Sequence, residues 1–113
     1  MRSVIRAAAF GTALAAVSAT AFSTYNANLV GVVASVATYT DADYVLFRLE
    51  NQPASHPACN ASYFVIPSET PSDRRKAMVA RLLLARATGE PITVGYDGTG
   101  ACASGYIQVH RVG

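Results

Sequence analysis

Polar and apolar residues alternate along most of this chain beyond its N-terminal part, a pattern typical of half-buried β-strands. The pattern is clearest in residues 44–50, where Val45, Phe47 and Leu49 fall on one side of the predicted strand. Further strands are predicted over residues 29–40, bent near Gly31, and over three later ranges: 62–67, 91–97 and 105–112. Inward positions on the last two are predicted to be Ile92, Val94, Tyr96, Ile107 and Val109.

A single segment of this part, residues 70–89, has the signals of a helix at both ends. Thr70 and Asp73 fit a capping box, and Pro71 suits the first helical position. Gly89 can take the left-handed conformation that ends a helix, and Pro91 prevents its continuation.

The helical spacing predicts which side of this segment is buried. At about 100° per residue, the predicted core face consists of Val79, Ala80, Leu83, Leu84 and Ala87. The arginines fall on the other side, with Met78 and Leu82 among them.

Residues 1–21 have the pattern of a signal peptide. Arg2 and Arg6 precede an uncharged apolar run, and Ala19-Thr-Ala21 supplies the small residues that signal peptidase recognises. The apolar run is shorter than the roughly 20 residues that span a membrane, although a retained anchor is the alternative. Cleavage after Ala21 would release residues 22–113 as one domain, secreted or periplasmic and free of the membrane.

Cleavage also changes the charge. The chain has 9 Lys and Arg against 7 Asp and Glu, and two of the basic residues, Arg2 and Arg6, precede the cleavage site. The remaining domain is then balanced at seven of each sign, so no basic excess favours nucleic acid as a partner.

The two cysteines, Cys59 and Cys102, both lie in the exported part. An even number in a small exported domain favours a disulfide, since the compartment is oxidising. The alternatives are two free thiols or a metal site. A metal site is disfavoured, because His56 and His110 are the only histidines and no closely spaced ligand pair exists.

The order of elements predicts the fold class. Three strands, one helix and two strands form a mainly β, α+β domain. This order is that of the OB-fold, a five-stranded, partly open barrel, and we expect the helix to close one end of it.

The run from Leu82 to Tyr96, together with Ser62-Tyr-Phe-Val-Ile66, resembles small exported bacterial OB-like proteins. Among these, it is most similar to the B subunits of subtilase-type AB5 toxins. The resemblance implies an exported OB-fold that binds glycans and assembles as a ring-shaped homo-oligomer.

Little in the sequence favours catalysis. A nucleophile, a base and an orienting group must converge, and we interpret both histidines as surface residues outside any such set. Asp41 and Asp43 flank a turn, where aspartate is common. We therefore expect a protein without enzymatic activity, metal or cofactor.

Binding is the better supported class. An OB-fold uses the outer face of its second and third strands and the neighbouring loops, and here these regions carry Tyr39, Tyr44, Arg48 and Tyr63. Tyrosine offers a flat apolar ring and a hydroxyl to a sugar, although its strand propensity also explains each position. The leading hypothesis is an exported glycan-binding domain. The alternative is an assembly protein, including a homo-oligomer, with an interface on the helix around Met78 and Leu82.

Overall fold

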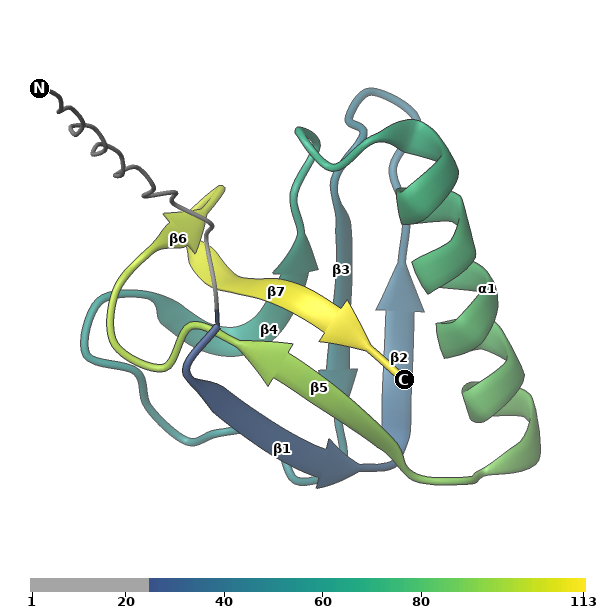
Figure 1. The fold of residues 1–113 in the computed structure, drawn as a ribbon, viewed down its shortest axis with the longest axis horizontal. Coiled ribbons are helices and arrows are strands. Elements are labelled where there is room, and N and C mark those ends of the chain that lie inside the picture. Colours follow the sequence, from purple (N-terminus) through teal and green to yellow (C-terminus); the bar gives the residue numbers. More distant parts are fainter. Residues whose placement is uncertain (1–24) are drawn as a thin grey trace, which may run out of the picture.

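The protein is mainly β with one helix, as predicted (Figure 1). The structure is a computed structural model that describes residues 25–113, so the predicted signal peptide, residues 1–21, lies outside the described residues. The elements are β1 (Ala27–Gly31), β2 (Val33–Ala37), β3 (Val45–Leu49), β4 (Asn60–Ile66), α1 (Ser72–Thr88), β5 (Ile92–Tyr96), β6 (Cys102–Ala103) and β7 (Tyr106–Val112).

The strands form a single curled sheet in the shape of a half-barrel. Their order is β1-β5-β7-β4-β3-β2, with β6 beside β7. All neighbours are antiparallel except β4 and β7, which are parallel. The first and last strands of this order, β1 and β2, are separated in the chain by Val32 alone. The continuous segment 27–37 therefore supplies both edge strands of the sheet.

The structure has seven strands in its described part, where five were expected. One difference is β6, a two-residue strand in the predicted loop around Cys102. The other is the predicted first strand, which divides at Val32 because its halves pair with different partners, β5 and β3.

Gly31 permits this division. A Cβ atom at Gly31 would overlap the side-chain oxygen of Asn51 and lie 3.0 Å from Leu49 Cδ1. The Asn51 amide donates a hydrogen bond to the Val30 carbonyl (2.9 Å), and the Glu50 N–H donates to the Val32 carbonyl (2.8 Å). The end of β3 is thereby fastened to the point where β1 becomes β2.

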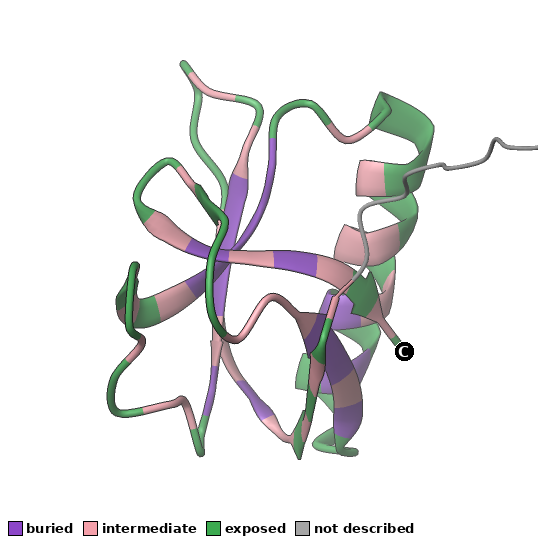
Figure 2. Cartoon of the chain, turned by 60° about the vertical axis from the view of Figure 1, so that its left-hand side comes forward, coloured by how far each residue is buried: buried purple, intermediate pink, exposed green. Residues whose placement is uncertain are grey.

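The predicted inward positions of the strands are confirmed. Val45, Phe47 and Leu49 of β3 are at most 5% exposed and belong to the core. Strands β4, β5 and β7 supply alternate residues to the same core: Phe64, Ile66, Ile92, Val94, Ile107 and Val109. Figure 2 shows buried positions recurring along the strands. Tyr96 packs at the edge of this core, its ring centroid 5.1 Å from that of Phe64.

The helix ends where predicted, but it begins differently. Gly89 has a left-handed φ of 76° and its N–H donates to the Ala85 carbonyl, which confirms the predicted C-terminal cap. At the other end Pro71 is the capping position and no side chain caps the helix, so the capping box predicted from Thr70 and Asp73 is wrong. Instead, the Arg75 guanidinium donates to the carbonyls of Ser68 and Thr70 (3.1 and 2.6 Å) and holds the entering loop.

The predicted core face of the helix is wrong for four of its five residues, and Val79 alone of the five is confirmed. Leu82 and Ala85 are completely buried, with Met78 and Val79 packed beside them, whereas Leu83 and Leu84 are 52% and 55% exposed. The outer side of α1 is accordingly exposed in Figure 2. Leu82 faces the core and is unavailable to a partner, so the interface expected around Met78 and Leu82 is also wrong.

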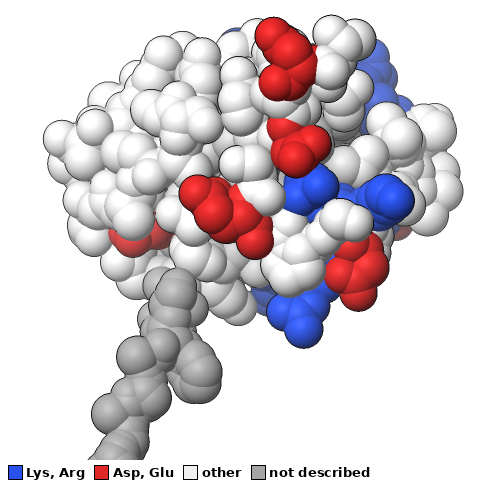
Figure 3. All heavy atoms as spheres, turned by 90° about the horizontal axis from the view of Figure 1, so that it is seen from above, with Lys and Arg blue, Asp and Glu red and all other residues white. Residues whose placement is uncertain are grey.

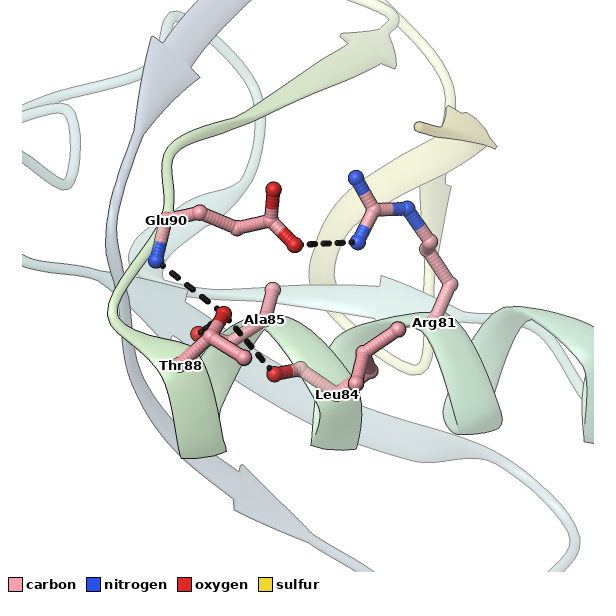
Figure 4. Close-up of polar contacts among 5 residues, drawn as sticks. All are labelled: Arg81, Leu84, Ala85, Thr88 and Glu90. Atoms are coloured by element: carbon pink, nitrogen blue, oxygen red, sulfur yellow. Dashed lines mark hydrogen bonds and ion pairs between the residues drawn. The ribbon is translucent and has the colours of Figure 1, made fainter.

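Polar contacts close the C-terminal end of the helix (Figure 4). The Thr88 hydroxyl donates to the Leu84 carbonyl (3.1 Å) and accepts from the Glu90 N–H (3.3 Å). Glu90 also forms an ion pair with Arg81 at 3.4 Å, which lies partly in solvent and contributes little to stability.

Two neighbouring leucines test the corrected faces. Leu82→Ala should lower the free energy of unfolding by about 2–5 kcal/mol, because it leaves a cavity in the core. Leu83→Ala is the matched control and should change it by less than about 0.5 kcal/mol. Urea unfolding of the two variants measures both values, and equal losses would contradict this orientation of the helix.

Candidate binding surface

The four residues predicted to bind a ligand fall into two clusters. Tyr39, which is 45% exposed in the β2–β3 loop, lies against Tyr44 with ring centroids 5.5 Å apart. On the strands, the Arg48 guanidinium carbon lies 5.7 Å from the centre of the Tyr63 ring, a cation–π contact.

Strand pairing places both clusters on the outer face of the sheet. Leu46 is paired with Val65 across β3 and β4, and directly opposed residues project from the same face. Alternation along each strand then puts Tyr44 and Arg48 on the side of Leu46, and Tyr63 on the side of Val65. From Tyr44 to Arg48 the strand rises about 13 Å, which is the spacing of the clusters along β3.

An apolar pair lies between the clusters. Leu46 and Val65 are 4% and 0% exposed, although they are on the outer side of the sheet and outside the core cluster. The outer face therefore combines a covered aliphatic centre with two tyrosines at one end and an arginine and a tyrosine at the other.

Tyr106 also belongs to this surface, although it is not among the four residues predicted from the sequence. Its ring meets that of Tyr63 edge-on, with centroids 6.0 Å apart. This contact depends on the parallel pairing of β4 with β7, which joins strands distant in the sequence. An outward tyrosine on the last strand was the only signal that could have identified it.

A pocket of about 460 Å³ opens next to Arg48. Its walls come from the end of β3, the β3–β4 loop and the start of β4: Arg48, Gln52, Pro53, Ala54, Ser55, His56, Cys59, Asn60, Ala61 and Ser62. A second hollow of about 290 Å³ lies between the β2–β3 loop and α1, and Tyr44, Arg75 and Lys76 are among its lining residues.

Hydrogen bonds from two side chains hold the wall of the larger pocket. Gln52 accepts from the Leu49 N–H and donates to the Ala61 carbonyl, both at 3.0 Å. His56 Nδ1 accepts from the N–H groups of Ala58 and Cys59 (3.1 and 3.0 Å). Because Nδ1 is an acceptor, the neutral ring carries its proton on Nε2 and donates it to the Asp97 carbonyl, 2.9 Å away. His56 is thus a half-buried structural residue, not the surface histidine expected from the sequence.

The predicted disulfide between Cys59 and Cys102 is present, with Cα atoms 5.7 Å apart. It joins the β3–β4 loop to β6 across a sequence separation of 43 residues. By the chain-entropy model, a loop of that size stabilises the fold by about 4 kcal/mol. The bridge and His56 together tie the pocket wall to the loop that follows β5.

Asp97 organises that loop. Its carboxylate accepts hydrogen bonds from the N–H groups of Thr99, Ala101 and Gly100 at 3.1, 3.1 and 2.9 Å. These bonds, that of Thr99 foremost, lower the pKa of Asp97 from 3.8 to about 2. Asn26 ties the same loop to the start of β1 by accepting from the Gly98 N–H at 2.8 Å.

Charges of the two signs are intermixed and form no patch of a single sign on the face seen in Figure 3. On the face seen in Figure 3, acidic and basic side chains lie next to one another, mostly over one half of the view. Within residues 25–113, no three His, Cys, Asp or Glu side chains are grouped so that they could hold a metal ion. In the same range, no helix is long and apolar enough to cross a membrane.

Comparisons with protein-family models, with curated proteins and with solved structures found no match to this chain.

The Asp97 loop should make stability depend on pH. A carboxyl group whose pKa is lowered by folding stabilises the native state above its unfolded pKa of 3.8 and loses this effect as pH falls through about 2. Asp97→Asn should therefore destabilise the protein by about 1 kcal/mol near neutral pH, a small value because the loop is in solvent.

The measurement is urea unfolding of the wild type and of Asp97→Asn at both ends of this range. The difference between them should shrink as pH falls from 3.8 to about 2. Asp41→Asn, in the exposed turn before β3, is the control and should change stability by less than about 0.5 kcal/mol. A difference that stays constant with pH would contradict the role of the Asp97 carboxylate.

Proposed function

We propose that this chain is an exported, non-enzymatic binding domain whose outer sheet face binds a glycan. The observation that carries the proposal is the arrangement of Tyr39 and Tyr44 at one end of a covered Leu46–Val65 pair and Arg48 and Tyr63 at the other. Aromatic rings stack on the apolar faces of sugars, while the tyrosine hydroxyls and the guanidinium hydrogen-bond to sugar hydroxyls.

The proposed fold is an OB-type barrel. Taken as two halves of one strand, β1 and β2 give five main strands together with β3, β4, β5 and β7, with the helix between the third and the fourth. The extra strand, β6, has only two residues. OB-folds bind oligosaccharides or oligonucleotides on strands two and three, which correspond here to β3 and β4. The balanced charge of residues 22–113 favours the saccharide.

Export is supported by the disulfide and by the signal-peptide pattern of residues 1–21. The resemblance of residues 62–66 and 82–96 to the B subunits of subtilase-type toxins points to the same ligand class. Membership of that group of proteins and a secreted or periplasmic location are both part of the proposal.

A glycan array of the purified protein tests the proposal. Binding of at least one glycan class is expected, and Tyr63→Ala should weaken it about tenfold or more, since aromatic contacts contribute about 1 kcal/mol or more beyond their area. Tyr25→Ala is the matched control, because the Tyr25 ring lies over Gly95 of β5 and stacks on His110 of β7, whereas Tyr63 lies on β4. Binding that survives Tyr63→Ala but not Tyr25→Ala would place the site elsewhere.

A second function, assembly through the helix, is favoured by the exposure of Leu83 and Leu84 on the outer side of α1. Ala80 and Ala87 of the same side are also exposed, so a second copy of the chain could pack closely there. This surface replaces the one expected around Met78 and Leu82.

Sedimentation velocity over a range of protein concentrations tests this assembly. Self-association is expected, and Leu84→Glu should weaken it about tenfold or more because it buries an unpaired charge in the interface. Arg74→Glu also introduces an acidic residue on the helix, but at its exposed N-terminal end, and should have a smaller effect. A protein that stays monomeric at every concentration would argue against assembly.

A further inference from the structure

Arg48 brings an uncompensated charge to the pocket beside the proposed glycan surface. Within residues 25–113 the one ion pair joins Arg81 to Glu90, so Arg48 has no carboxylate partner there. Its guanidinium lies over the Tyr63 ring, and its N–H groups remain able to donate to a ligand. No Asp or Glu is among the residues that line the pocket.

The other polar groups of the pocket can each donate a hydrogen bond. The Asn60 side-chain oxygen already accepts from the Ser62 N–H (2.9 Å), so its NH₂ group is the part that remains for a ligand. Ser55 and Ser62 add hydroxyl groups that can donate. These groups come from β3, the loop and the start of β4, and therefore approach the pocket from different directions.

The remaining polar side chains of the wall are already engaged. Gln52 bridges Leu49 and Ala61, and both ring nitrogens of His56 are hydrogen-bonded. The disulfide at Cys59 fixes the end of the same loop. The donors are therefore mounted on a wall that is already held in place, which reduces the entropic cost of binding.

We infer that this pocket binds the sulfate ester of a sulfated saccharide, an inference that rests on the proposed glycan-binding function. A sulfate ester presents three outer oxygens in a tetrahedral arrangement, which suits donors from several directions better than the two coplanar oxygens of a carboxylate. Its single negative charge balances the one guanidinium, whereas a phosphate monoester carries a charge of about −1.5 to −2. The sugar ring would extend alongside Tyr63, since Arg48 lines the pocket and also contacts the Tyr63 ring.

The test compares ligands that differ at one carbon of the same hexose: the neutral sugar, its sulfate ester, its phosphate ester and the corresponding uronic acid. Isothermal titration of the purified protein should give the tightest binding for the sulfate ester, about tenfold or more above the neutral sugar. Added salt should weaken binding of the sulfate ester more than that of the neutral sugar.

Variants assign this preference to the pocket. Arg48→Gln keeps a polar, hydrogen-bonding side chain but removes its charge, and should abolish the preference for sulfate. Ser62→Ala should reduce it and serves as the second variant if Arg48→Gln is unstable on thermal unfolding. Arg111→Gln removes an exposed positive charge from β7 and is the control that should retain the preference.

The outcomes separate the two proposals. If the neutral sugar binds as tightly as the sulfate ester and Tyr63→Ala weakens both, the glycan function stands and the sulfate site is overturned. Tighter binding of the phosphate ester or of the uronic acid also overturns it. If no saccharide in any of the four forms binds, the proposed function itself fails.

Discussion

At Gly31 the chain passes from one half of the sheet to the other, and the close approach of Asn51 and Leu49 leaves no room for a side chain there. Because Val32 alone separates β1 from β2, the two outer strands of the sheet cannot move apart. The sheet must then curl, and its inner face becomes the single core that Leu82 and Ala85 complete from the helix. The shape of the outer face follows from the same constraint.

The conformation of the β3–β4 loop and of the loop after β5 depends on covalent and polar contacts. A disulfide, the His56 imidazole and the Asp97 carboxylate act on two loops that are about forty residues apart in the sequence. The structure contains little hydrophobic burial around these loops, since Asp97, Thr99 and Gly100 are a polar cluster in or near solvent. Covalent and hydrogen-bonded links therefore hold the loops in place of a hydrophobic core.

The buried sides of the strands could be predicted from the sequence, whereas the buried side of the helix could not. The difference is whether the apolar pattern allows one assignment of the buried side or several. In a strand, alternate residues share a face, so Val45, Phe47 and Leu49 allow one assignment of the buried side. Around α1, apolar residues occur in nearly every direction, from Met78 and Val79 to the run Leu82-Leu-Leu84. Several rotations of the helix about its axis would then bury a similar apolar area. The shape of the sheet determines that Leu82 is the leucine that faces the core.

The candidate surface was predictable to the extent that it depends on alternation within single strands. Alternation placed Arg48 and Tyr63 outward, but their contact with each other and with Tyr106 depends on the pairing of β3, β4 and β7. The pocket wall was less predictable, because Gln52 and His56 act through hydrogen bonds to backbone groups whose positions follow from the fold. The curled sheet therefore determines which outward residues become neighbours. At Arg48 it places a cation beside an aromatic ring, with no carboxylate to neutralise it among the described residues.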